Sequence, residues 1–407
     1  MADKMMDRAN WYLDLVKQGG PKIESLKAGL SVVAPSGASS GSKNLPAVSR
    51  NLVEVTEYLQ TLDLPDGDGY DGGLNVSLLI RRTEDLDNSS FKDIDLDALH
   101  LSGFGKWLVE QGAWAAKRVY TEPKPDLAAG GKWLREWSRD NMVKATTVTL
   151  VTSPAEHARD AAWVPTVIVA IRGSKAKHDW AVNANYKDAA GAADNFLGVP
   201  SPGQSYRVHG GFLECARAMA PKIAELIKAV RERHDVGGPI DLLFTGHSAG
   251  AAVAALLYAH MMKPAGNERN GLAGVRESFR SVHAITFAAP PVTAPALTAP
   301  AADVGGLFLA VIHEGDPIPR GDVPYMQWLA AVGLGARNLA PMPARELLNA
   351  GEPLLLRSST PPQGPVELFR FAPPGSVGSL GGMVFGNPPM HDMGEYLVSL
   401  GLQVREE

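Results

Sequence analysis

The sequence predicts an α/β fold, in which a central, mostly parallel β-sheet is flanked by helices. From about residue 144, short runs of apolar and β-branched residues alternate with helical patterns. The middle runs are mostly apolar, which is typical of strands that helices cover on both faces. One of them passes directly into an apolar helix through a glycine-bounded turn at residues 246–250. Together these observations indicate repeated strand–helix–strand units.

The elements of this fold can be placed in chain order. Strands are expected over Thr146 to Thr152 and Thr166 to Ile171, where β-branched residues predominate. Apolar residues at helical spacing predict an amphipathic helix from Phe212 to His234, and Ala249 to Met262 is apolar enough for a buried helix. The remaining expected strands, of which the last two form a hairpin, are Ile240 to Phe244, Val282 to Phe287, Leu307 to Ile312, Pro353 to Leu356 and Glu367 to Phe371.

The first 140 residues are expected to form a helical extension packed on a catalytic domain of residues 141–407. Apolar residues at three- and four-residue spacing predict helices over Asn51 to Leu62, Leu96 to Val119 and Ala128 to Met142. No motif in this region carries chemistry. Near the other end, Tyr325 to Leu348 is expected to form one or two extra helices, which predicts a cap over about residues 323–350.

Composition limits the classes of protein that need to be considered. The chain has 407 residues, a net charge of −5 and ordinary globular proportions of hydrophobic and charged residues, so nucleic acid is not an expected partner. Its single cysteine, Cys215, cannot form an intrachain disulfide, and the first residues lack the apolar core of a signal peptide. The longest apolar run, Ala249 to Met262, is too short to span a bilayer. These features predict a cytoplasmic protein without a transmembrane segment.

The glycine-bounded turn carries the chemistry. Residues 246–250 read Gly-His-Ser-Ala-Gly, a G-x-S-x-G pattern that follows an apolar strand at once and opens an apolar helix at once. This context is that of a nucleophile elbow. Side chains at positions 246 and 250 would clash with the neighbouring strand and helix, which explains the two glycines. We therefore expect an α/β-hydrolase fold with Ser248 as its nucleophile.

A serine hydroxyl needs a base to remove its proton, and in this fold the acid and then the histidine follow the serine in the chain. Asp316 lies just beyond the expected strand Leu307 to Ile312, and His391 is the one histidine that follows Asp316. If Asp316 is the acid, His391 is the base by elimination. The competing acids are Asp303, which lies before that strand, and Asp322.

The oxyanion formed during acyl transfer also needs hydrogen-bond donors. One expected donor is the backbone N–H of Ala249, the residue after the nucleophile. The second should lie in a loop after an earlier strand. The strand Thr166 to Ile171 runs into Arg172-Gly-Ser-Lys, where Ser174 offers a backbone N–H and a hydroxyl.

Several blocks of the chain occur in an order that is typical of one protein family. They are Val167 to Ser174, Val208 to Phe212, Thr245 to Ala251, Ile285 to Val292 and the loop Ile312 to Arg320. Together they resemble the class 3 (fungal-type) lipase family, over about residues 140–400, and the last is similar to the family's acid loop. The resemblance implies Ser248 as nucleophile, Asp316 as acid and His391 as base, with Ser174 and Ala249 as the oxyanion hole.

The resemblance also implies a lid directly after Ser174, over about residues 175–186. His178 and Trp180 lie in this segment, which has few apolar groups and is a poor membrane-binding face. A weakly apolar lid favours a water-soluble ester or acyl-thioester over a lipid interface. In the expected cap, Met326 and Trp328 are candidates for an acyl-binding wall, and a plain core role is equally expected for them.

The main functional prediction is a serine hydrolase that cleaves a carboxylic ester through an acyl-enzyme on Ser248. Its partners are expected to be a small-molecule ester, lipid or acyl-thioester, and no metal or organic cofactor is expected. The alternative is a biosynthetic acyltransferase or a thioesterase-like, product-releasing enzyme with the same triad. A third hypothesis is a non-catalytic member of the fold that serves as a binding module.

Overall fold

A central sheet of eight strands organises the protein. The computed structural model describes residues 96–120, 132–134, 144–157, 159–173, 193–234, 238–263, 271–300, 305–322, 324–326, 328–329, 341–357, 368–371, 380 and 385–402. Within these residues the sheet has the strand order β1-β2-β3-β5-β6-β8-β9-β10. Its strands are β1 (Lys132–Leu134), β2 (Thr146–Val151), β3 (Thr166–Ile171), β5 (Asp241–His247), β6 (Val282–Phe287), β8 (Phe308–His313), β9 (Glu352–Leu356) and β10 (Leu368–Arg370).

The middle of the sheet is parallel and its edges are antiparallel. β3, β5, β6, β8 and β9 run parallel to one another, with Ile171 opposite Gly246 and His247 opposite Phe287. β1 and β2 on one edge and β10 on the other pair antiparallel. β3, β5, β6 and β8 are buried along their whole length, as expected for strands covered on both faces. The predicted fold class, an α/β-hydrolase fold with a mostly parallel sheet, is confirmed.

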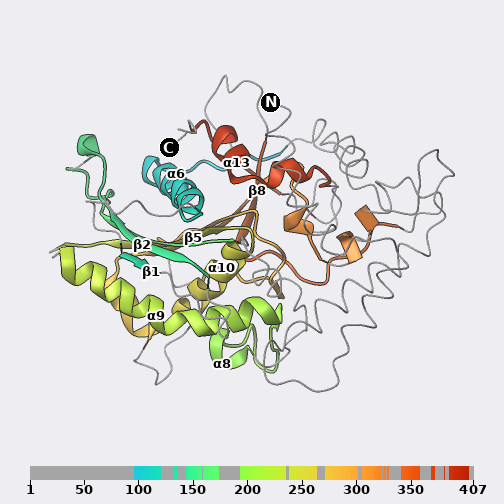
Figure 1. Ribbon diagram of the computed structural model, residues 1–407, viewed down its shortest axis with the longest axis horizontal. Helices are drawn as coiled ribbons and strands as arrows, with labels where there is room; N and C mark the ends of the chain where they lie inside the picture. Colours follow the sequence, from blue (N-terminus) through green and yellow to red (C-terminus); the bar gives the residue numbers. More distant parts are fainter. Residues whose placement is uncertain are drawn as a thin grey trace, which may run out of the picture.

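Helices cover both faces of this sheet (Figure 1). α6 (Gly103–Arg118) and α13 (Met393–Ser399) pack together on one face. α9 (Gly210–His234) and α10 (Ala249–Met262) pack together on the other, where α10 contacts β5, β6 and β3. The short elements are α8 (Asp194–Leu197), β4 (Arg207–Val208), α11 (Leu272–Val275), β7 (Thr293–Ala294) and the 3-10 turns η1 (Ala155–His157), η2 (Arg276–Ser278), η3 (Ile318–Arg320) and η5 (Pro388–His391).

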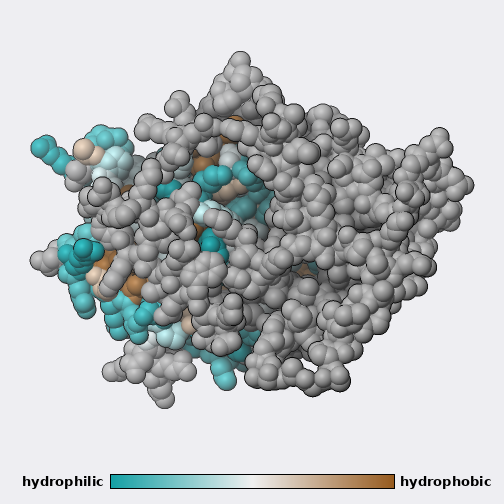
Figure 2. Space-filling view, in the orientation of Figure 1, coloured by the Kyte–Doolittle hydropathy of each residue, from teal (hydrophilic) through white to brown (hydrophobic). Residues whose placement is uncertain are grey.

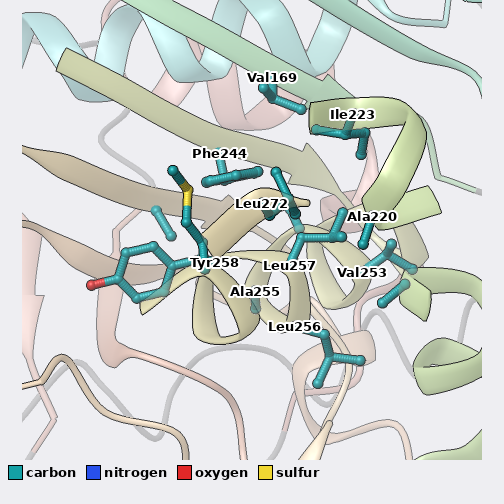
Figure 3. Packing of buried hydrophobic residues seen from close by; sticks show 14 of the residues in the cluster. Val169, Ala220, Ile223, Phe244, Val253, Ala255, Leu256, Leu257, Tyr258 and Leu272 are labelled. Atoms are coloured by element: carbon teal, nitrogen blue, oxygen red, sulfur yellow. The ribbon is translucent and has the colours of Figure 1, made fainter. Parts of the chain in front are cut away.

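The larger core cluster lies between the sheet and the α9–α10 layer (Figure 3). α10 is rich in alanine and is buried from Ala249 to Tyr258. Because alanine side chains are small, the helix can lie close to β5, where Phe244 packs on the same cluster as Val253 and Leu257. No helix in the described part of the chain is both long and apolar enough to cross a bilayer. The described residues visible in Figure 2 are mostly hydrophilic, with scattered apolar ones.

α6 supplies the opposite layer, although it precedes the expected start of the catalytic domain. Ser102 caps its first turn by accepting a hydrogen bond from the N–H of Gly105 at 3.0 Å. Trp107 and Leu108 are buried in a second core cluster with Leu243 and Ile285 of the sheet. The helix lies inside the expected range Leu96 to Val119. The boundary near residue 140 stays a prediction, and Asn51 to Leu62 lies outside the described residues.

Two expected helical segments are corrected by the structure. Within the expected helix Ala128 to Met142, Lys132–Leu134 is a strand that pairs with Thr146–Val148 of β2. A free edge of the sheet offers backbone hydrogen bonds there, and such tertiary pairing overrides a helical pattern. In the expected cap, residues 324–326 and 328–329 are helical, whereas residues 341–348 form no helix. Leu348 instead makes a β-bridge with Thr293 of β7, which pairs with β4 in a separate two-stranded sheet.

Candidate active site

The strained turn at Ser248 lies between the end of β5 and the start of α10. Ser248 has φ 58° and ψ −133°, a conformation that is rare for residues other than glycine. A Cβ at Gly246 would lie 2.7 Å from the Ile171 carbonyl oxygen, and one at Gly250 would lie 2.2 Å from the same atom. The two glycines therefore let the elbow pack closely against the end of β3, and Ser248 lies at the carboxyl end of β5.

The hydroxyl of Ser248 contacts the imidazole of His391. The distance from Oγ to Nε2 is 2.9 Å. A serine just before a helix commonly caps it by accepting from a backbone N–H, but this Oγ makes no such bond. Its backbone is held separately, because its N–H donates to the Phe287 carbonyl at 3.0 Å. The side chain therefore does not cap the helix, and its hydroxyl is directed at the imidazole of His391.

The other nitrogen of His391 faces Asp316. Nδ1 lies 3.1 Å from Oδ1 and 3.0 Å from Oδ2 of the carboxylate. A carboxylate can only accept, so Nδ1 carries a proton and Nε2 of the neutral ring is left to accept the proton of Ser248. This is the tautomer that a general base for the serine hydroxyl requires.

Asp316 is fully buried and held as an anion. Burial alone would raise its pKa, but the charge and hydrogen bond of His391, with hydrogen bonds from Tyr396 and Ile318, hold the pKa below its usual value. The Tyr396 hydroxyl donates to Oδ2 at 2.7 Å, and the Ile318 N–H donates to Oδ1 at 2.9 Å. Burial and the nearby carboxylate raise the pKa of Tyr396 well above its ordinary value, so it keeps the proton that it donates.

The loops that carry the acid and the base are joined to each other. The Asn387 N–H donates to the Gly315 carbonyl at 2.8 Å, beside Asp316. The Tyr325 hydroxyl donates to the Phe385 carbonyl at 2.7 Å and accepts from the Phe385 N–H at 2.8 Å. Since Phe385 and Asn387 lead directly into η5, these bonds fix the approach of His391 to the site.

The structure describes one of the two expected oxyanion-hole donors, Ala249. Ala249 is the first residue of α10, so its N–H has no intrahelical acceptor and is available to a ligand. The loop after β3 approaches the elbow closely, because a Cβ at Gly173 would lie 2.6 Å from the His247 carbonyl oxygen and 3.2 Å from the Ser248 Cβ. Ser174 follows Gly173 but lies outside the described residues, and its role as second donor stays a prediction.

Three residues at the site were not singled out by their sequence. Tyr396 binds Asp316, and His247 donates from Nε2 to the His391 carbonyl at 2.8 Å. Tyr120, from the segment after α6, lies 3.0 Å from Nδ1 of His247. Tyr396 could have been found from its place five residues after His391, and His247 from its place inside the elbow, whereas nothing local marks Tyr120.

Comparison with known protein families gives a match over the part of the chain that holds the nucleophile and the acid. Residues 168–326, which hold Ser248 and Asp316, match the family described as Lipase (class 3). The predicted resemblance to class 3 lipases is confirmed. A carboxylic ester hydrolase is the enzyme class that this match supports. No curated protein matches the chain.

Solved structures of fungal lipases are also similar to this protein. The native propeptide complex of Rhizomucor miehei lipase is 17% identical, with 90% of this chain and 96% of that chain covered and a TM-score of 0.42. A fungal lipase–inhibitor complex is 16% identical over 76% of this chain and 99% of its own, with a TM-score of 0.44. A triacylglycerol lipase from Penicillium expansum is 13% identical, covering 72% and 98%, with a TM-score of 0.40.

The structure describes only some of the other residues that the sequence suggested for the site. Asp322 accepts from the Tyr325 N–H at 3.0 Å, and burial raises its pKa, whereas the competing Asp303 lies outside the described residues. Met326 and Trp328 are half-buried in the helical segment after the acid loop, and their acyl-binding role stays a prediction. The lid over residues 175–186, with His178 and Trp180, also lies outside the described residues.

A cavity of about 550 Å³ lies at the opposite end of the sheet from Ser248. Its wall includes Asp241 and Glu352, which begin β5 and β9. Asp241 is buried and accepts from Arg280 at 2.8 Å and from His283 at 3.2 Å. Burial alone would raise the pKa of Asp241, but these two bonds outweigh it and lower the pKa. The charges in this cavity are thus compensated within the protein, which is what a structural cluster requires.

Proposed function

We propose that the protein is a serine esterase that hydrolyses a carboxylic ester through an acyl-enzyme on Ser248. The observation that carries the proposal is the position of one imidazole: His391 lies within hydrogen-bonding distance of both Ser248 and Asp316. A buried anion on one side and a hydroxyl on the other are what a general base needs. The class 3 lipase match over residues 168–326 supports the same chemistry.

The proposed reaction begins with removal of the serine proton. Nε2 of His391 takes the proton while Oγ of Ser248 attacks the ester carbonyl carbon. The developing oxyanion accepts a hydrogen bond from the Ala249 N–H, and we propose Ser174 as the second donor. The ion pair with Asp316 stabilises the imidazolium, because the carboxylate is buried and cannot move away.

The second half of the reaction returns the enzyme to its starting state. His391 gives its proton to the leaving alkoxide, so the alcohol departs and Ser248 keeps the acyl group. Water then attacks the acyl carbonyl, losing a proton to His391, and the carboxylic acid leaves as Ser248 regains its hydrogen. We propose water as the acceptor. Added alcohols or amines that capture the acyl group faster than water would identify the protein as an acyltransferase instead.

The decisive experiment compares two serine variants. Ser248→Ala should lower kcat for a short p-nitrophenyl ester by at least about 10⁴-fold and abolish labelling by a fluorophosphonate probe. Ser201→Ala removes an exposed serine and is the matched control, which should keep the wild-type rate. Wild-type hydrolysis or labelling by Ser248→Ala would overturn the proposal. The cytoplasmic location expected from the sequence stays a prediction.

A further inference from the structure

A short chain of hydrogen bonds leads from the segment after α6 to the backbone of the proposed base. The Tyr120 hydroxyl lies 3.0 Å from Nδ1 of His247, and Nε2 of His247 lies 2.8 Å from the carbonyl oxygen of His391. The imidazole rings of His247 and His391 lie against each other, with centroids 4.6 Å apart and an angle of 34° between the ring planes. His247 thus occupies the space between Tyr120 and His391.

The direction of each hydrogen bond follows from the acceptor at one end. A carbonyl oxygen can only accept, so Nε2 of His247 carries a proton and donates it to His391. In a neutral ring Nδ1 is then an acceptor, and the Tyr120 hydroxyl must be its donor. Burial, followed by the charge of His391, lowers the pKa of His247 to about 3, which keeps the ring neutral and in this one tautomer.

Tyr120 lies beside the nucleophile as well as beside His247. A single Cβ added at Gly173 would lie 2.0 Å from the Tyr120 hydroxyl oxygen and 3.2 Å from the Ser248 Cβ. The hydroxyl is therefore lodged against the loop that leads to Ser174. Tyr120 follows the end of α6, which is buried against the sheet, and its N–H donates to the Lys117 carbonyl at 3.2 Å.

We propose that Tyr120 and His247 are positioning residues that hold the backbone of His391, so that its imidazole stays between Ser248 and Asp316. This inference rests on the proposed function of Ser248 and His391. The carbonyl of His391 is at the end of η5, and the side chain reaches the site from the same residue. Rotation of that peptide would move Nε2 away from Ser248, and a displacement of about 1 Å can cost about 10²-fold in rate.

The test uses variants that remove one atom group at a time. Tyr120→Phe keeps the ring and loses the hydroxyl, which leaves Nδ1 of His247 without its donor. His247→Leu loses both bonds, whereas His247→Gln retains an amide N–H that can reach the His391 carbonyl. Tyr258→Phe, which removes a buried hydroxyl well along α10 from the elbow, is the matched control.

The expected result is a loss of kcat without a rise in KM. Tyr120→Phe should lower kcat for the short p-nitrophenyl ester, and the rate of fluorophosphonate labelling, by about 10-fold, and His247→Leu by about 10²-fold. His247→Gln should recover most of the loss. The double variant Tyr120→Phe/His247→Leu should be no slower than His247→Leu alone, because the tyrosine acts through the histidine. The control should keep the wild-type rate. Tyr120→Phe loses one hydrogen bond to a buried nitrogen, so it should still melt in one transition, no more than a few degrees below wild type.

The outcomes separate the two proposals. If the wild-type protein shows no hydrolysis or labelling that depends on Ser248, both proposals fall. If it does, and Tyr120→Phe reacts at the wild-type rate, the positioning role alone is refuted. Additive losses in the double variant, or a loss in His247→Gln equal to that in His247→Leu, would also refute it. If His247→Leu does not fold, the comparison of Tyr120→Phe with wild type still decides the positioning role.

Discussion

Lowering the pH should destabilise the protein through His247. Burial holds the pKa of this imidazole at about 3, against its ordinary value of 6.5. Below pH 6.5 the unfolded chain therefore binds a proton at this histidine that the folded protein does not. The unfolded state gains free energy from that proton, so the contribution of His247 to stability is lost as pH falls from about 6.5 towards about 3.

The size of this effect follows from the width of the window. Each pH unit inside it is worth about 1.4 kcal/mol, so a fall from pH 6.5 to pH 5 should cost about 2 kcal/mol. The charged and titratable groups that act on His247 are His391, Asp316 and Asp392, with Tyr120 at Nδ1. Burial also lowers the pKa of His313, which adds its own loss of stability as the pH falls below 6.5.

A comparison with His247→Gln isolates the contribution. Urea unfolding at pH 7 and at pH 5 would give the free energy of unfolding of both proteins. Glutamine does not titrate, and His313 is present in both, so the wild type should lose about 2 kcal/mol more than the variant between the two pH values. Equal losses in the two proteins would refute the reasoning, since they would mean that His247 binds the same number of protons in the folded and unfolded states.

Two further predictions concern the acid and the elbow. Asp316→Asn should lower kcat by about 10³–10⁴-fold, because an amide does not hold the imidazole tautomer that accepts the Ser248 proton. The control Asp322→Asn should lower kcat far less. Equal losses for the two variants would reject Asp316 as the acid. Gly250→Ala should lower the free energy of unfolding by about 2–3 kcal/mol, because its Cβ would clash with the Ile171 carbonyl. Gly238→Ala, which has open space around the added Cβ, is the control in thermal melting. Matching melting temperatures for the two variants would contradict this account of the elbow.

The sequence was most informative where an apolar run is bounded at both ends. β3, β6 and α10 begin and end at the expected residues, because each is a run of mostly apolar or β-branched residues that is buried along most of its length. The expected helix around Lys132–Leu134 was wrong because an edge strand depends on its pairing with β2, which lies outside the segment whose pattern suggested a helix. Likewise, residues 341–348 are bound to Thr293 rather than formed into a helix.

The residues of the site also divide into those that a pattern in the sequence predicts and those that it does not. The elbow is a local pattern. The place of Asp316 after a strand favoured it over Asp303 and Asp322, and the chain order then left His391 as the base. The structure brings both residues together with Ser248. Tyr120 could not be selected, because its hydrogen bond to His247 joins residues 127 positions apart and no spacing rule relates them. Contacts between distant segments depend on how layers pack, and a single sequence does not display that packing.

The distances along the chain between the partners at Ser248 have a consequence for how activity appears during folding. Tyr120 and His247 are 127 positions apart, His247 and His391 are 144, and Asp316 and His391 are 75. Such contacts close large loops, so they form slowly and only after the sheet between them has assembled. A partly folded molecule that already has the elbow would still lack its base. Recovery of ester hydrolysis after dilution from denaturant should therefore lag behind the return of secondary structure, which makes enzymatic activity a reporter of complete folding.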